Sequence, residues 1–180
     1  MKLFYREDDI SKTTTVEALK FTHNQFINAH KDHTIAIICE GMESNKELIK
    51  YINSTKNWNF AIHGWTHDNY CLMTKARIER ELDMCILLIE KLFGQVPDKW
   101  YLPWNGFTKN YGFDKVPYVA DLAIYHGVDV DVDCDHITHA VEMLEMGRNP
   151  VTDTIYFHGW DVEDLKLLPQ LLFLTEKNGR

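Results

Sequence analysis

Apolar residues in this chain follow two alternating patterns, short continuous runs and longer stretches with helical spacing. Residues 34–39 form a continuous apolar run, which is typical of a strand buried on both faces of a sheet. Residues 74–93 instead repeat apolar side chains every three or four positions, from Ile78 to Phe93, as an amphipathic helix does. Thr74 can cap the start of this helix, and Gly94 can end it in a left-handed conformation.

The same two patterns recur along the rest of the chain. Five further strands are predicted, at residues 2–6, 59–62, 99–102, 122–125 and 154–157. Helices are predicted from a capping box at residues 14–17 to about Asn28, from a second capping box at residues 44–47, near residues 138–146, and after a cap at Asp161. Pro169 should kink or break this last helix, because proline lacks the backbone N–H that a helix uses.

Alternation of strands and helices without hairpin signals predicts a parallel sheet with helical crossovers. Six strands fit either an incomplete (β/α) barrel or an open doubly wound sheet. A nucleotide-binding sheet has no support, because the chain contains neither GxGxxG nor a P-loop motif. The 180 residues show no linker or low-complexity segment, so we expect one domain spanning residues 1–180.

Charge and composition narrow the classes of partner. The chain has 27 acidic and 19 basic residues, a formal net charge of −8, which disfavours nucleic acids and anionic membranes because both are bound through basic patches. No apolar stretch is long enough to span a membrane, and residues 1–9 lack the apolar core of a signal peptide. We therefore expect a cytoplasmic protein whose cysteines are reduced, with Cys39 and Cys85 packed in the core. The four cysteines are Cys39, Cys71, Cys85 and Cys134.

Two histidines, His63 and His67, stand four residues apart just after the predicted strand at 59–62. Four residues make about one helical turn, so both rings can point the same way, and neutral imidazole is a common ligand of zinc. Such a pair alone is a weak signal, since histidines at the start of a helix often lie on the surface without a function. A third ligand and a catalytic base would have to come from elsewhere in the chain.

Other candidate residues follow other predicted strands. Two more apolar runs end in His-Gly, at His126 and His158, and the acidic pair Asp8 and Asp9 follows the first strand. Because α/β folds place their chemistry at the carboxyl ends of parallel strands, we expect these side chains to meet.

The order of these motifs resembles the polysaccharide deacetylase family, also known as the NodB homology domain or carbohydrate esterase family 4. The resemblance rests on the acidic pair, on H-x-x-x-H, on Pro103-Trp104 after the fourth strand, and on a lone histidine after the last strand. It covers nearly the whole chain and implies an incomplete or distorted (β/α) barrel of mainly parallel strands with outer helices.

The resemblance also implies roles for individual residues. It implies a divalent metal, with zinc favoured, held by Asp9, His63 and His67. It implies further that Asp8 is the general base, that the backbone N–H of Trp104 stabilises the oxyanion, and that His158 is the general acid.

The chemistry is consistent with these roles. Two histidines and one carboxylate leave coordination positions open for water and substrate. Asp8 would accept a proton from the attacking water, and His158 would protonate the departing amine. The expected reaction is hydrolysis of an N-acyl group, foremost N-acetyl, of a sugar or a related amide.

The chain departs from the family pattern at several positions. Gly64 occupies the serine or threonine position of H-[ST]-x-x-H, and Tyr101 replaces the arginine that orients the base. Arg6, beside the acidic pair, is a candidate to substitute for that arginine in space. The acidic residue that tunes the acid histidine has no clear counterpart, and the candidates are Asp129, Asp131 and Asp161.

Several residues have competing interpretations. His126 has no counterpart in the family, so we expect a structural or substrate-contacting role. The acidic segment 129–135 is expected to be a solvated loop, because it lacks the glycine and the closing glutamate of a calcium loop. Glu40 could line the site or cap a turn, and Asp68 could support a metal-bound histidine. Three tryptophans follow strand ends and could stack on a sugar or pack around the mouth of the site: Trp65, Trp104 and Trp160.

The sequence thus predicts a metal-dependent deacylase that acts on an N-acylated sugar or oligosaccharide. Two other interpretations stay open. One is a binding module of the same fold without catalysis, which the missing arginine favours. The other is an amidohydrolase that acts on a non-sugar amide. The sequence leaves the oligomeric state open.

Overall fold

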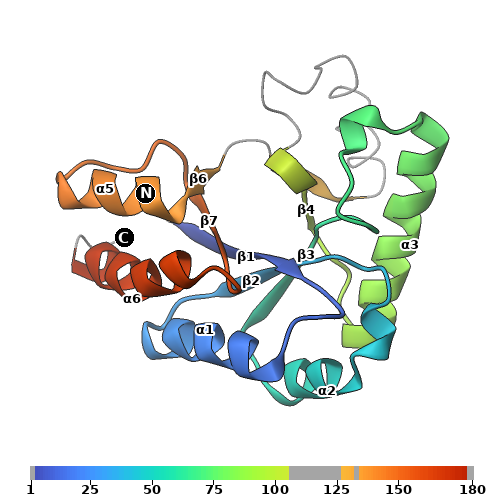
Figure 1. Ribbon diagram of the computed structural model, residues 1–180, viewed down its shortest axis with the longest axis horizontal. Helices are drawn as coiled ribbons and strands as arrows, with labels where there is room; N and C mark the ends of the chain where they lie inside the picture. Colours follow the sequence, from blue (N-terminus) through green and yellow to red (C-terminus); the bar gives the residue numbers. More distant parts are fainter. Residues whose placement is uncertain (1–2, 106–126, 132–133, 178–180) are drawn as a thin grey trace.

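The computed structural model describes residues 3–105, 127–131 and 134–177, and in these ranges seven strands form one sheet (Figure 1). The strands are β1 (Phe4–Ile10), β2 (His33–Ile37), β3 (Trp58–Ile62), β4 (Lys99–Tyr101), β5 (Asp129–Asp131), β6 (Asp135–His136) and β7 (Thr154–His158). Every pair of neighbouring strands is parallel.

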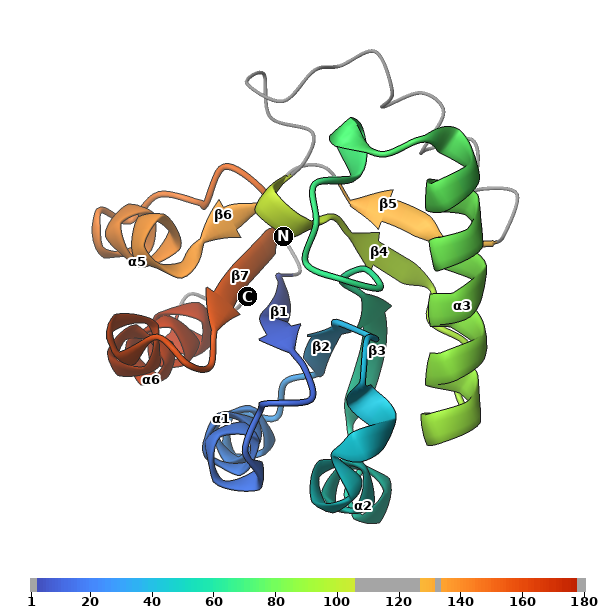
Figure 2. The ribbon, with the colours of Figure 1, turned by 45° about the vertical axis from the view of Figure 1, so that its right-hand side comes forward.

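The order of the strands decides between the two predicted architectures. The order across the sheet is β5-β4-β3-β2-β1-β7-β6. Read from the β6 edge, the order is β6-β7-β1-β2-β3-β4-β5. Neighbouring strands are consecutive in the chain, except that the last strand, β7, lies beside the first strand, β1. This is the cyclic order of a (β/α) barrel, open between β5 and β6, whereas a doubly wound sheet reverses its order at a switch point. The expected incomplete barrel is confirmed, and Figure 2 shows the curled sheet with the helices outside it.

In the described ranges, five helices cover the outer face of the sheet. They are α1 (Val16–Asn28), α2 (Lys46–Ser54), α3 (Lys75–Phe93), α5 (Ile137–Glu145) and α6 (Val162–Lys177). Short 3-10 turns occupy η1 (Met42–Ser44), η2 (Tyr70–Leu72) and η3 (Pro103–Asn105). Among the helices of the described ranges, none combines the length and the hydropathy that crossing a membrane requires.

The helix caps test the predicted boundaries. Thr74 accepts a hydrogen bond from the third residue of α3, and Gly94 ends that helix with φ 70°, as predicted. Both predicted capping boxes begin one residue too early, because Thr15 and Asn45 are the observed N-caps of α1 and α2. Pro169 does not end α6. The buried leucines on either side of it pack into the core, which offsets the lost backbone hydrogen bond.

The apolar core forms two outer layers and a small interior. One cluster packs β1, β2 and β3 against α2 and α3, and a second packs β1 and β7 against α5 and α6. Inside the curl, Ala36 and Ala61 leave room for Tyr101. The guanidinium of Arg6 lies 4.2 Å from the Tyr101 ring, although β1 and β4 are not neighbours, so both side chains lie inside the barrel.

The segment predicted as a solvated acidic loop contains two short strands. Asp129–Asp131 pairs with β4, and Asp135–His136 pairs with β7. Pairing extends the sheet at both edges and satisfies backbone groups that would otherwise need water. The Asp135 carboxylate accepts hydrogen bonds from the Thr152 backbone N–H and from His139, each at 2.9 Å. The strand predicted at 122–125 and His126 lie outside the described residues.

Candidate metal and catalytic site

The two aspartates of the site depend on an irregularity in β1. The strand was predicted to end at Arg6, but it continues to Ile10 and contains the acidic residues. Successive side chains of a regular strand point to opposite faces. Here the register with β2 shifts between Glu7 and Ile10, and Asp9 has φ 65°. This bulge lets the adjacent residues Asp8 and Asp9 face the same cavity.

All six predicted site residues line one cavity of about 420 Å³ at the carboxyl ends of the strands. The carboxyl ends of β1, β3, β4 and β7 contribute its lining, which consists of Asp8, Asp9, His63, His67, Trp104, Tyr156, His158 and Trp160. Tyr156 was not singled out from the sequence. It precedes His158 by two residues on β7, so the two side chains lie on the same face of the strand.

Asp9, His63 and His67 form a compact group of potential metal ligands. The Oδ1 atom of Asp9 lies 3.3 Å from Nε2 of His63 and 3.1 Å from Nε2 of His67. Nδ1 of His63 lies 2.8 Å from the Tyr101 carbonyl. A carbonyl only accepts hydrogen bonds, so Nδ1 carries a proton, and Nε2 is the ring nitrogen that faces Asp9.

A divalent cation fits this donor set. Within the described residues Oδ1 of Asp9 is buried without a hydrogen-bond partner of good geometry, and it lies close to Nε2 of both histidines. Burial raises the pKa of Asp9, but the contacts with His63 and His67 outweigh it and lower that pKa. The carboxylate therefore stays ionised, and a cation would satisfy all three atoms. Two histidines and one carboxylate also leave positions open, as catalytic zinc sites do.

The loop that carries both histidines requires glycine at its second position. Gly64 has φ 103°, and a Cβ built there would lie 2.7 Å from the Thr66 carbonyl and 2.9 Å from the Tyr70 ring. The Tyr70 hydroxyl accepts a hydrogen bond from the Trp65 backbone and donates one to Glu81. A serine or threonine, as in the family motif, would not fit here without movement of this loop.

Arg6 orients Asp8 from inside the barrel. Its Nη2 donates to Oδ2 of Asp8 at 2.8 Å, and both side chains are almost fully buried. The guanidinium also lies over the rings of Tyr101 and Tyr156. Arg6 therefore stands where the sequence suggested a substitute for the missing arginine. In the described ranges Oδ1 of Asp8 has no hydrogen-bond partner, which leaves it available to accept a proton.

The partner of His158 is a residue that the sequence analysis missed. Asp164, in the first turn of α6, accepts a hydrogen bond from the His158 backbone at 2.8 Å and lies 3.3 Å from its Nδ1. The other oxygen of Asp164 lies 3.2 Å from Nε2 of His136. Asp161, one of the three candidates from the sequence, instead caps α6 by accepting a hydrogen bond from the Glu163 N–H. An acidic residue one turn into a helix that follows a strand-end histidine was the available signal.

The electrostatic surroundings favour a protonated His158. Burial lowers its pKa, but the hydrogen bond with Asp164 and the charges of Asp8 and Asp9 outweigh burial and raise that pKa. A histidine that holds its proton near neutral pH suits a general acid.

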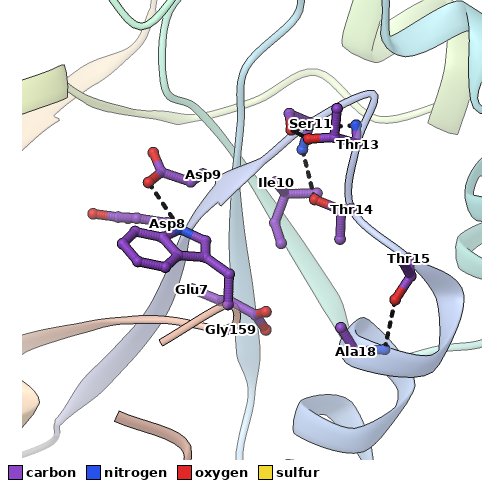
Figure 3. A pocket seen from close by; sticks show the side chains of 11 residues that line it. Glu7, Asp8, Asp9, Ile10, Ser11, Thr13, Thr14, Thr15, Ala18 and Gly159 are labelled. Atoms are coloured by element: carbon purple, nitrogen blue, oxygen red, sulfur yellow. Dashed lines mark hydrogen bonds between the residues drawn. The ribbon is translucent and has the colours of Figure 1, made fainter. Parts of the chain in front are cut away.

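The three tryptophans have different surroundings. Trp65 packs against the large core cluster. Trp104 and Trp160 line the cavity and are 56% and 66% exposed. Their indole N–H groups donate to the His67 carbonyl at 3.0 Å and to Oδ2 of Asp9 at 3.1 Å. The bond to Asp9 is drawn in Figure 3, at an adjoining cavity of about 230 Å³.

Two candidate residues lie away from the cavity. Glu40 is about half exposed and pairs with Lys12 at 3.3 Å. Asp68 pairs with Arg77 at 2.7 Å, so this carboxylate supports the loop through an arginine.

Fold and site together define an α/β barrel protein with a His-His-Asp group at the carboxyl ends of its strands. Residues 8–116, more than half of the chain, match the family described as polysaccharide deacetylase. The chain belongs to this family. Among curated proteins, none matches its sequence.

Solved structures with similar folds include active and inactive proteins. A family 4 carbohydrate esterase from Streptomyces lividans, in complex with acetate, has a TM-score of 0.74 at 14% identity, covering 99% of this chain and 89% of that one. A peptidoglycan deacetylase from Bacillus subtilis has 0.70 at 11%, covering 98% and 84%. A pseudoenzyme of the CE4 family from Bacillus anthracis has 0.75 at 14%, covering 99% and 61%. These identities establish a shared fold only.

Proposed function

We propose that this protein is a metal-dependent deacylase that removes an N-acyl group, foremost N-acetyl, from a sugar or oligosaccharide. Membership of the polysaccharide deacetylase family supports the class of reaction. The observation that carries the proposal is the convergence of Asp9, His63 and His67 beside Asp8 and His158 in one cavity. Zinc is the proposed ion, because histidine nitrogens and one carboxylate are its usual ligands at catalytic sites.

The protein's own residues supply the proton transfers. Oδ1 of Asp8 accepts a proton from the attacking water while Arg6 holds the other oxygen. The backbone N–H of Trp104 donates to the developing oxyanion. His158, held by Asp164, delivers a proton to the departing amine. A bound divalent ion would polarise the acyl carbonyl and lower the pKa of water.

The cavity suits a sugar ring. Trp104 and Trp160 both line it and expose more than half of their surface, and aromatic faces of this kind stack on the apolar faces of sugars. Solved relatives with this fold include a peptidoglycan N-acetylglucosamine deacetylase and a deacetylase with bound substrate. An N-acetylated sugar is therefore the proposed substrate class, and the net charge of −8 argues against nucleic acid.

The first test is the metal content of the purified protein beside His67→Ala, followed by acetate release from N-acetyl sugars. We expect about one zinc per chain in the wild type, a large loss in His67→Ala, and metal-dependent acetate release. Asp8→Asn should keep the metal and lose turnover by at least roughly 100-fold, as expected for removal of a general base. Wild-type protein that takes up no divalent metal would refute the proposal.

A non-catalytic binding module is the second candidate. Two observations favour it: Tyr101 stands in place of the family arginine, and one structural neighbour is a pseudoenzyme. Metal-loaded protein that binds N-acetylglucosamine oligomers but releases no acetate would support this alternative. Acetate release from simple N-acetyl amides, with none from sugars, would instead indicate an amidohydrolase.

A further inference from the structure

We propose that Trp160 is a positioning residue of the metal site, holding the Asp9 carboxylate so that a single oxygen faces the metal. This inference rests on the proposed function, because it assumes a cation beside His63 and His67. Its basis is the hydrogen bond from the Trp160 indole to Oδ2 of Asp9, 3.1 Å long (Figure 3).

The two oxygens of Asp9 have separate partners. Oδ1 faces Nε2 of His63 and of His67 at 3.3 and 3.1 Å. Oδ2 receives the indole N–H of Trp160 and lies 3.9 Å from Nε2 of His158. Turning both oxygens of Asp9 to one cation would move Oδ2 from its place beside the indole, so it competes with that hydrogen bond. Trp160 thus favours binding through Oδ1 alone and leaves coordination positions open for water and substrate.

The position of Asp9 makes such support necessary. Asp9 lies in the bulge of β1 with φ 65°, a conformation that costs a non-glycine residue free energy. Its side chain is 18% exposed, so packing alone does not hold it. The backbone of the bulge and the indole bond together orient this carboxylate.

Among the residues that the structure describes, the contacts of Trp160 are few. The side chain is 66% exposed, and its ring lies 5.0 Å from the His158 ring, tilted by 41°. Burial therefore does not explain its orientation, whereas the bond to Asp9 does. Hydrogen-bond partners of metal ligands typically change metal affinity by 10- to 100-fold when they are removed.

Trp160→Phe tests the inference, because phenylalanine keeps an aromatic ring beside His158 and removes the N–H donor. Trp104→Phe is the matched control, since its indole N–H donates to the backbone carbonyl of His67 and not to a side-chain oxygen or nitrogen of the metal site, and phenylalanine keeps an aromatic ring beside His67. Zinc affinity is measured by titration against a competing chelator, and Co²⁺ replaces zinc for visible absorption spectra. Circular dichroism and thermal melts of the metal-free proteins confirm that both variants fold.

We expect zinc to bind Trp160→Phe about 10-fold more weakly than the wild type, with Trp104→Phe within roughly 2-fold. The Co²⁺ bands of Trp160→Phe should weaken, because a carboxylate free to bind through both oxygens raises the coordination number. Equal affinities for all three proteins would overturn the inference while leaving the proposed function intact, and so would an equal loss in both variants. A wild-type protein that binds no metal would refute both the inference about Trp160 and the proposed function.

Discussion

Replacing Arg6 with methionine should destabilise the fold strongly, because it leaves the carboxylate of Asp8 buried without its partner. The side chains of Arg6 and Asp8 are 2% and 3% exposed, and their charged atoms lie 2.8 Å apart. Removing one partner of a buried ion pair costs roughly 3–5 kcal/mol of unfolding free energy. For a domain of this length that corresponds to a fall in Tm of roughly 6–20 °C.

Urea denaturation in the presence of a chelator measures this loss without a contribution from bound metal. Arg6→Lys is the control, because lysine keeps the charge but cannot present the planar fork that lies over Tyr101 and Tyr156, so its loss should be smaller. Combining Arg6→Met with Asp8→Asn should cost less than the sum of the two single changes. A loss below about 1 kcal/mol in Arg6→Met, the range of exposed pairs, would refute the assignment of a buried structural pair.

Three further predictions concern other parts of the protein. Gly64→Ser, which restores the family residue, should cost roughly 1–3 kcal/mol because of the positive φ and the close Tyr70 ring; metal affinity and thermal melts check it, and a variant as stable as the wild type contradicts it. Burial would raise the pKa of Asp164, but its hydrogen bonds with two histidines lower it. Asp164→Asn should therefore lower the unfolding free energy at pH values above about 4, the ordinary pKa of aspartate. Urea midpoints of the variant and the wild type should converge as the pH falls below about 4. Burial and the neighbouring His33 lower the pKa of His23 to about 4. The part of the unfolding free energy that depends on neutral His23 should be fully present above about pH 6.5 and should be lost as the pH falls towards 4. A His23→Phe variant that keeps this pH dependence would disprove the role of His23.

The sequence alone was enough to predict most of the architecture. Continuous apolar runs alternate with helical spacing, and this local pattern defines strands and helices without knowledge of their neighbours. The α3 helix, with Thr74 and Gly94 at its ends, was predicted from its own residues. The choice between barrel and doubly wound sheet was not local, because it depends on β7 lying beside β1, two strands far apart in the chain.

The candidate site divides in the same way. Asp8, Asp9, His63, His67, Trp104 and His158 could be chosen from the sequence, because side chains at the carboxyl ends of parallel strands share one edge of a sheet. The positions of these side chains relative to one another could not be predicted from the sequence. The bulge at Asp9 turns two successive carboxylates to one cavity, contrary to the alternation that a strand pattern predicts.

Arg6 could be named as a candidate from the sequence, but the surroundings of the supporting residues depend on tertiary structure. Arg6 and Asp8 stand two residues apart on β1 and therefore share one face of the strand, but only closure of the sheet brings Tyr101 and Tyr156 around the guanidinium. Asp164 reaches His158 because packing of α6 against the sheet places its first turn at the end of β7. The contacts of Arg6 with the two tyrosines and of Asp164 with His158 join side chains whose distance depends on the packing of whole elements. Local sequence determines the elements and the types of ligand, and the packing of those elements determines which side chains meet.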